Sequence, residues 1–171
     1  MKKNLVLTGM MGVGKSTLGK ILSERLNMKF IDVDKLIEEK ESMLINDIFD
    51  IKGEKYFREI EKKITLKSMY TSNNIVALGG GAFLNKAIRN LALKNCICFW
   101  LDLDLNVLLK RLTKSNKRPL LKKDDLENNI KKIYDKRKLV YKLAHFKINC
   151  KKLSKTLISK KISDIYETQG N

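Results

Sequence analysis

GMMGVGKST, residues 9–17, lies between an apolar run, NLVLT, and a stretch with the apolar spacing of an amphipathic helix, LGKILSERL. Its Gly9, Gly14, Lys15 and Ser16 complete the pattern G-x-x-x-x-G-K-[ST], in the strand-before, helix-after context that this pattern requires. The glycines let the backbone turn its N–H groups inward, and the helix N-terminus adds a partial positive charge. The stretch therefore predicts a loop that cradles the phosphates of a nucleotide.

The lysine and the hydroxyl residue of this loop have separate expected roles. Lys15 is expected to reach the β- and γ-phosphates as a point charge, and the Ser16 hydroxyl can coordinate Mg²⁺. The residues that we expect to bind the nucleotide here are Gly12, Val13, Gly14, Lys15, Ser16 and Thr17.

The length and composition of the chain favour a single domain. With 171 residues, of which 43% are hydrophobic, it can bury one core and is too short for two ordinary domains. No apolar run is long enough to span a bilayer, and the glycines of MKKNLVLTGMMG interrupt any signal-peptide pattern. We therefore expect one domain over residues 1–171, soluble and cytoplasmic, with no membrane partner.

The three cysteines predict neither a disulfide framework nor a zinc site. Their number is odd, the sequence has no CxxC pair, and there is one histidine. Cys96 and Cys98 share one face of an expected strand, and Cys150 ends another. The pattern favours small apolar core residues.

The net charge of +17 raises the possibility of a nucleic-acid binder. The lysines, however, are spread along the chain and alternate with apolar residues at helical spacing, which is typical of solvated helix faces. No aromatic-rich binding motif accompanies them. We therefore expect no nucleic-acid partner, and a surface that draws anionic ligands toward any cleft.

Short apolar runs alternate with helical stretches along the chain. The expected strands lie at residues 4–9, 29–34, 73–81, 96–103 and 145–150. The expected helices lie at residues 15–26, 35–50, 54–70, 85–93, 105–112, 154–166, and after 125 to about 143. Continuously apolar strands separated by helices are typical of a parallel sheet with both faces covered. The pattern predicts an α/β fold of three layers around a five-stranded parallel sheet.

Polar residues and glycines follow three of these strands. Asp32 and Asp34 flank Val33 at the end of KFIDVD, and strand alternation would put both carboxylates on the same side. In nucleotide enzymes one such aspartate can hold Mg²⁺, directly or through water, and another can accept a hydrogen bond from a hydroxyl nucleophile. The alternative is that Asp34 caps the following helix. Because ligands gather at the carboxyl ends of parallel strands, we expect one active site at this edge.

A further candidate segment is FDIKGEKYFREIEKKI, residues 49–64. Arg58 and Glu61 are three residues apart on one helix face and can pair. Phe49 and Phe57 can form an apolar wall. On the pattern alone, an amphipathic surface helix with a routine ion pair explains these residues equally well.

Taken together, several motifs resemble the shikimate kinase family. They are GMMGVGKST, FIDVD, the segment F-x-x-x-G-E-x-x-F-R-x-x-E at 49–61, ALGGGAF at 77–83, and Arg-Pro at 118–119. The resemblance runs from the first strand to at least residue 144. It implies a P-loop kinase fold, ATP and Mg²⁺, and phosphorylation of shikimate at its 3-hydroxyl in aromatic amino acid biosynthesis.

The resemblance also implies roles for residues on the acceptor side. Ser16 and, through water, Asp32 would hold the magnesium ion, and Asp34 would bind the shikimate hydroxyls and accept the proton of the reacting one. The residues implied for the rest of the shikimate pocket are Arg58 and Arg137 as a carboxylate clamp, Gly80 and Gly81 through their backbone, and Phe49 and Phe57 as lining. This acceptor-binding segment would span about 35–62.

On the nucleotide side the resemblance implies a mobile lid at about 113–125. Arg118 on this lid would swing toward the phosphates, and Arg111 would stack on the adenine. Lys15, Asp34 and Arg118 would then be the catalytic residues, and we expect the enzyme to act as a monomer.

Three other functions compete with this expectation. A related P-loop kinase for gluconate or a nucleoside monophosphate would need a different acceptor pocket. A GTPase-type switch would need N-K-x-D after a late strand, and SNKRP at 115–119 does not fit that pattern. A nucleic-acid binder would show tight, salt-sensitive association with DNA or RNA.

Overall fold

The computed structural model describes residues 2–113 and 126–169. The strands are β1 (Asn4–Thr8), β2 (Lys29–Asp32), β3 (Asn74–Ala77), β4 (Cys96–Asp102) and β5 (Phe146–Asn149). The helices are α1 (Lys15–Leu26), α2 (Val33–Glu41), α3 (Ile45–Tyr70), the 3₁₀ helix η1 (Ala82–Leu84), α4 (Lys86–Asn95), α5 (Leu105–Thr113), α6 (Leu126–Tyr141) and α7 (Lys155–Gln169).

The strands form one parallel sheet in the order β2-β3-β1-β4-β5. In register, Leu7 of β1 pairs with Ala77 of β3, which pairs in turn with Asp32 of β2. The three strands therefore end level with one another. The chain leaves β1 toward β2 and leaves β3 toward β4, so this common edge is a topological switch point, where ligands of such sheets bind.

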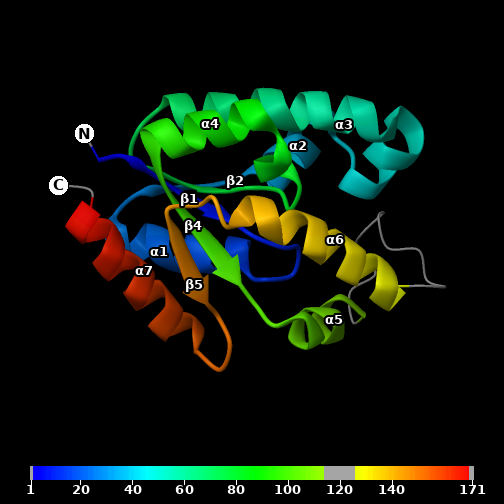
Figure 1. Cartoon of the computed structure of the whole chain (residues 1–171). Coiled ribbons are helices and arrows are strands. Elements are labelled where there is room, and N and C mark those ends of the chain that lie inside the picture. Colours follow the sequence, from blue (N-terminus) through cyan, green and yellow to red (C-terminus); the bar gives the residue numbers. More distant parts are fainter. Residues whose placement is uncertain (1, 114–125, 170–171) are drawn as a thin grey trace.

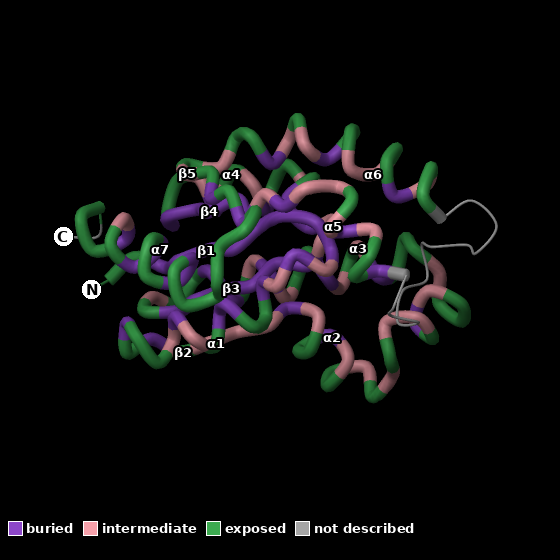
Figure 2. Tube along the Cα trace, turned by 90° about the horizontal axis from the view of Figure 1, so that it is seen from below, coloured by how far each residue is buried: buried purple, intermediate pink, exposed green. Residues whose placement is uncertain are grey.

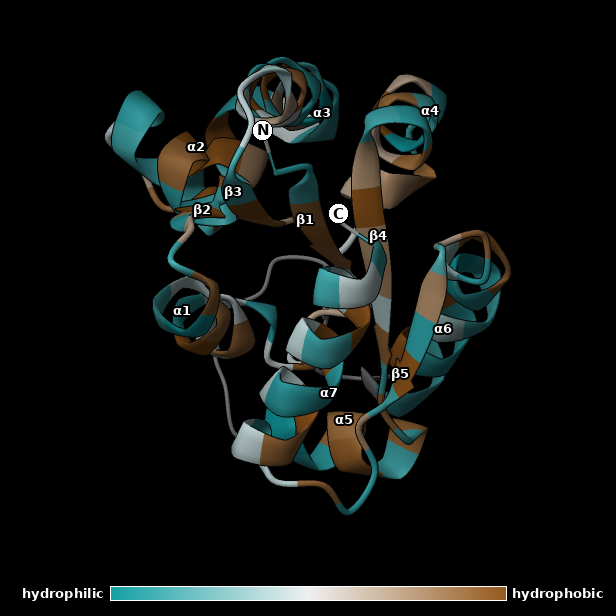
Figure 3. Ribbon diagram, turned by 90° about the vertical axis from the view of Figure 1, so that its left-hand side faces the viewer, coloured by the Kyte–Doolittle hydropathy of each residue, from teal (hydrophilic) through white to brown (hydrophobic). Residues whose placement is uncertain are grey.

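Helices cover both faces of the sheet (Figure 1, Figure 3). α1 and α7 lie together on one face, and α3 and α4 lie side by side on the other. β1, β3 and β4 are buried between the two layers, as Figure 2 shows. The predicted three-layer α/β fold with a five-stranded parallel sheet is confirmed.

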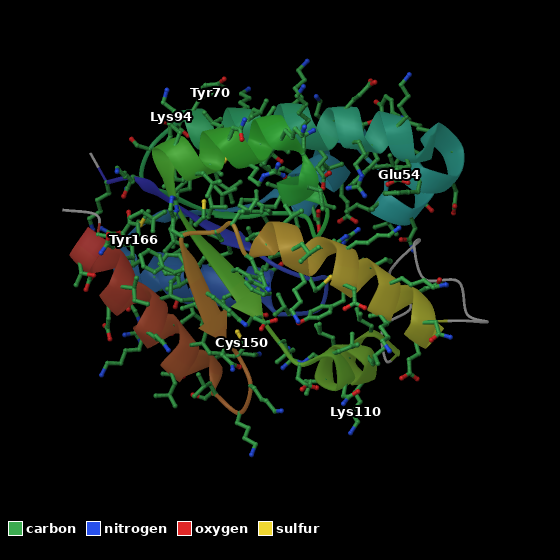
Figure 4. The ribbon with its side chains drawn as sticks, in the orientation of Figure 1. Glu54, Tyr70, Lys94, Lys110, Cys150 and Tyr166 are labelled. Carbon is green, nitrogen blue, oxygen red and sulfur yellow. The ribbon has the colours of Figure 1, made fainter. Side chains whose placement is uncertain are left out.

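The cysteines belong to this core. Cys96, Cys98 and Cys150 are free and buried, as the sequence predicts. Burial raises the pKa of the Cys96 and Cys150 thiols to about 11, so both stay protonated at neutral pH. Cys150 is labelled in Figure 4 at the end of β5. None of the described helices combines the length and apolar character that crossing a bilayer requires.

Three expected element boundaries are wrong. The third strand, expected to reach residue 81, ends at Ala77, and the glycines after it form a turn in which the Ala82 backbone N–H donates to the Gly79 carbonyl at 3.1 Å. The second strand stops at Asp32 because the Asp32 carboxylate accepts a hydrogen bond from the Lys35 backbone N–H at 3.4 Å and starts α2. The expected helix at 35–50 is two helices, because Ser42 ends α2 in the left-handed conformation, with φ of 51°.

Candidate functional site

The glycine loop between β1 and α1 folds around the side chain of Lys15. The Lys15 ammonium is buried and donates to the Gly9 carbonyl at 2.9 Å and to the Met10 carbonyl at 3.0 Å. Gly9 in turn packs against β4, since a Cβ there would lie 2.5 Å from the Leu101 carbonyl oxygen. The loop is thus held close to the sheet, with its lysine inside it.

A cavity of about 160 Å³ opens at the level ends of β1, β2 and β3. Its lining consists of Gly12, Gly14, Lys15, Ser16, Thr17, Asp32, Asp34, Ala77, Leu78 and Gly80. The structure therefore brings the glycine loop, both aspartates and the triple-glycine turn to one hollow. Residues predicted for the phosphates and the metal line this cavity, and Asp34 and Gly80 of the predicted acceptor pocket lie there with them. The lining does not include the other described residues predicted for the acceptor pocket, which are Arg58, Arg137, Phe49, Phe57 and Gly81.

The two aspartates reach the cavity from different elements. Asp32 ends β2, and Asp34 lies in the first turn of α2. The interpretation that both side chains leave the same side of one strand is therefore wrong, and so is the alternative that Asp34 caps the helix, because Asp32 is the cap. Asp32 and Asp34 are therefore placed by the start of a helix and not by the alternation of a strand. Both carboxylates still line the cavity.

Charged side chains lie very close to the backbone of the triple-glycine turn, residues 79–81. A Cβ at Gly79 would lie 2.7 Å from Asp34 Oδ1 and 2.5 Å from Glu61 Oε1. A Cβ at Gly81 would lie 2.7 Å from Arg58 Nη1. Only glycine leaves room for three ionisable side chains this close to the backbone.

Arg58 is held by two carboxylates and two aromatic rings. Its Nη1 donates to Glu61 Oε2 at 2.8 Å, and its Nε and Nη2 donate to Glu54 Oε1 at 3.2 and 3.1 Å. Glu54 is exposed on α3, near the bend of that helix (Figure 4). The guanidinium lies 5.2 and 5.9 Å from the ring centres of Phe57 and Phe49, whose centroids are 4.6 Å apart.

The predicted pair and aromatic wall are thus both present, and Glu61 is deeply buried. Burial raises the pKa of the Glu61 carboxyl above its ordinary value; Asp34 nearby adds to the shift, and the Arg58 and Arg137 guanidinium groups oppose it. Glu54 was not predicted as a partner of Arg58. Its position four residues before the arginine was the available signal.

The other side of the glycine turn is fixed by α6. Arg137, buried to 7% exposure, donates from Nη1 to the Gly80 carbonyl at 3.0 Å. The Tyr141 hydroxyl hydrogen-bonds the same carbonyl and lies 4.0 Å from the Met10 sulfur of the glycine loop. Burial raises the pKa of Tyr141 to about 12, so the hydroxyl keeps the proton that it donates. Sequence reasoning missed Tyr141, whose only signal was its place one helical turn after Arg137.

Arg111 lies at the outer side of the glycine loop. From α5 its Nη1 donates to the Gly12 and Val13 carbonyls at 3.3 and 3.4 Å. The structure thus places it next to the phosphate site, and stacking on adenine stays a prediction. Arg118 and residues 114–125 of the expected lid lie outside the described residues.

The cavity wall has the oxygen ligands that Mg²⁺ takes. Within residues 2–113 and 126–169 no three acidic, histidine or cysteine side chains cluster as a complete metal cage. Mg²⁺ in phosphoryl-transfer sites does not need one, because substrate phosphates and water supply most of its ligands. A hydroxyl from Ser16 and a carboxylate from Asp32, both on the cavity wall, fit that arrangement.

Known proteins match the chain along most of its length. A family model described as shikimate kinase covers residues 11–167. A shikimate kinase of Sulfurihydrogenibium sp. is 49% identical over 160 residues, which are 94% of this chain and 95% of that protein. The chain belongs to the shikimate kinase family.

Other members of the family match equally long stretches. The shikimate kinase of Caldicellulosiruptor saccharolyticus is 40% identical over 96% of this chain and 95% of its own. Among solved structures, a shikimate kinase from Acinetobacter baumannii in complex with shikimate superposes with a TM-score of 0.94 at 28% identity, covering 99% of this chain and 95% of that chain. The Aquifex aeolicus shikimate kinase gives a TM-score of 0.86 at 32% identity, with 97% of each chain covered.

A more distant neighbour shares the fold alone. A gluconokinase from Sinorhizobium meliloti superposes with a TM-score of 0.61 at 13% identity, covering 99% of this chain and 94% of that chain. Since shikimate kinases superpose more closely, the family assignment and the fold comparison agree.

Proposed function

We propose that this chain transfers the γ-phosphoryl group of ATP to the 3-hydroxyl of shikimate and releases ADP and shikimate 3-phosphate. Membership of the shikimate kinase family supports the reaction. The observation that carries it to this site is the cavity in which Lys15, Asp34 and Gly80 meet, with Arg58 and Arg137 on the two sides of the glycine turn.

The acceptor carboxylate binds between the two guanidinium groups in this proposal. Guanidinium groups bind a carboxylate in a planar, bidentate way that lysine cannot reproduce. Arg58 already offers its Nε and Nη2 to a carboxylate, that of exposed Glu54, so shikimate exchanges one carboxylate partner for another. Phe49 and Phe57 form the apolar wall beside it, and Gly80 and Gly81 let the rigid ring approach the backbone.

Asp34 acts on the reacting hydroxyl. Its carboxylate lies against Gly79, at the boundary between the glycine turn and the phosphate loop. There it orients the acceptor hydroxyl and accepts its proton as the new P–O bond forms. Lys15 and the loop N–H groups neutralise the charge on the transferred phosphoryl group and on the departing ADP.

Ser16 and, through water, Asp32 hold the Mg²⁺ of the ATP complex in this proposal. When bound, the ion neutralises phosphate charge and aligns the γ-phosphoryl group for in-line transfer. Arg111 stacks on the adenine and Arg118 reaches the phosphates, as the family resemblance implies.

The proposal also covers the setting of the reaction. The chain works as a monomer in the cytoplasm, on small molecules and without nucleic acid. The dispersed lysines, with a net charge of +17, support only the small-molecule part of this proposal, because a positive field draws anionic ATP and shikimate toward the cavity.

A coupled assay of ADP release tests the proposed function. The purified protein is given ATP and Mg²⁺ with shikimate, gluconate or nucleoside monophosphates in turn. We expect rapid turnover with shikimate and only background ADP release with the others. No turnover with shikimate, or a higher kcat/KM with another acceptor, would overturn the assignment.

A further inference from the structure

One carboxylate at the end of α2 bridges the two sides of a bend in α3. Glu41 Oε2 accepts from Lys52 Nζ at 2.7 Å and from the Tyr56 hydroxyl at 2.8 Å. The helix bends at Gly53. Lys52 is the residue immediately before the bend, and Tyr56 lies three residues after it, in the second half of α3. The Glu41 side chain is only 7% exposed. The hydrogen bonds from Lys52 and Tyr56 lower the pKa of Glu41, so the bridge stays ionised at neutral pH.

The bend itself is not fixed by packing at Gly53. Gly53 has φ of 81° and ψ of 165°, a region that is essentially restricted to glycine and that interrupts the helix. A Cβ at this position would meet no atom within 4 Å. Gly53 allows the bend through its dihedral angles, and contacts of the residues on either side of it, such as buried Ile48 and Phe57, contribute to holding the angle.

The angle of the bend decides whether the acceptor wall is assembled. Phe49 belongs to the first half of α3, whereas Phe57 and Arg58 belong to the second. The two rings nevertheless stand 4.6 Å apart, and the Arg58 guanidinium lies over both. A small change of the angle would part Phe49 from the other two and leave the guanidinium over one ring.

We propose that Glu41 is a positioning residue for the acceptor site, which fixes the bend of α3 and so holds Phe49 against Phe57 and Arg58. This inference rests on the proposed function, because it takes Arg58 and the aromatic wall as ligands of shikimate. Lys52 lies 4.8 Å from the centre of the Tyr56 ring, so the three bridging side chains contact one another across the bend.

Shikimate binding in the Glu41→Ala variant tests the inference. We expect the dissociation constant and the KM for shikimate to rise by about three- to tenfold, with the KM for ATP unchanged. This is less than the two hydrogen bonds to Glu41 would contribute directly, because Glu41 acts on shikimate only through the bend of α3. Tyr56→Phe and Lys52→Met, which are milder, should each give part of the effect. Glu39→Ala, at an exposed site on the same helix, is the matched control and should change neither constant.

A double-mutant cycle shows whether Glu41 acts through Arg58. In an Arg58→Ala background, Glu41→Ala should raise the KM for shikimate by less than twofold, since the positioned group is gone. Unchanged shikimate constants in Glu41→Ala and Tyr56→Phe, equal rises for ATP and shikimate, or full additivity with Arg58→Ala would each overturn the inference. A wild-type protein without shikimate turnover would instead overturn the proposed function.

Discussion

At the scale of single residues, the acceptor site differs from the rest of the surface in its use of arginine. The chain carries most of its positive charge on lysine, yet Arg58 and Arg137 are the cations that meet the glycine turn. A planar guanidinium can bond Gly80 with one N–H group and still offer others to a carboxylate. A lysine ammonium at the same position would carry the same charge but could not form the planar pair of hydrogen bonds that a guanidinium makes with a carboxylate.

Arg137→Lys therefore separates charge from geometry. The variant should raise the KM for shikimate roughly tenfold to a hundredfold, because charge-assisted hydrogen bonds worth about 1.5–3 kcal/mol are lost. The KM for ATP should stay within twofold of its wild-type value. Steady-state kinetics with each substrate varied in turn provide the measurement. Lys136→Arg, at the exposed neighbouring position, is the control, and an unchanged KM for shikimate in Arg137→Lys would refute the carboxylate clamp.

Titration of Glu61 is expected to make the use of shikimate depend on pH. Burial raises the pKa of this carboxyl, and below that pKa it becomes neutral and no longer pairs with the Arg58 guanidinium. We expect kcat/KM for shikimate to fall as the pH drops through the raised pKa, and the acidic limb to move to lower pH in Glu61→Gln. Coincident limbs for the two proteins would show that Glu61 does not control Arg58.

The raised pKa of Glu61 affects stability and activity in opposite directions: lowering the pH is expected to reduce kcat/KM for shikimate but to stabilise the folded state. Because the folded state binds the Glu61 proton more tightly than the unfolded state, this group favours folding most below its unfolded pKa. Its contribution is lost as the pH rises through the folded pKa. Ionised Glu61, which pairs with Arg58, therefore contributes less to stability than the protonated form does.

At the scale of secondary-structure elements, the apolar runs located every strand, and the errors fall where a local polar contact decides. Alternation extended the second strand to residue 34, but the Asp32 side chain starts a helix there instead. The break at Ser42 carries neither glycine nor proline and could not be read from the sequence. Gly53 was recognised as an interruption, although the angle it allows depends on Glu41, Lys52 and Tyr56.

The bend at Gly53 supports a prediction at this scale. Gly53→Ala places a side chain at φ of 81° and should lower the free energy of unfolding by about 1–3 kcal/mol, the usual cost of such a conformation. Denaturant titration would measure this loss, and the KM for shikimate should rise as well if the helix straightens to relieve the strain. Lys55→Ala, at an exposed position just after the bend, is the control. A Gly53→Ala protein as stable as wild type would show that the bend carries no strain.

At the scale of the whole molecule, the site is assembled from segments that the sequence keeps far apart. Arg137 on α6 meets Gly80 across 57 positions, and only the family resemblance assigned it to the site. Tyr141, which bonds the same carbonyl, was not assigned at all. Motifs next to strand ends could be predicted because parallel strands bring their ends together, whereas contacts made by a helix from elsewhere depend on packing that no local pattern encodes.

The net charge of the molecule gives a prediction about salt. If dispersed lysines draw anionic substrates to the cavity, raising NaCl from about 50 to about 500 mM should raise the KM for ATP by about two- to fivefold, since the Debye length shortens severalfold. A parallel series with a neutral osmolyte controls for osmotic effects. If the KM for ATP does not change with salt concentration, the positive charge of the surface does not draw ATP to the cavity.

The identity of the phosphorylated product tests the central claim most directly. Phosphorus NMR and mass spectrometry of a reaction with ATP, Mg²⁺ and shikimate should show shikimate 3-phosphate and ADP formed in equal amounts. Lys15→Ala and Asp34→Asn, which keep the surrounding residues, should form neither product above background. ADP without the phosphate ester, or undiminished ester formation by Asp34→Asn, would contradict phosphoryl transfer in the cavity where the three strand ends meet.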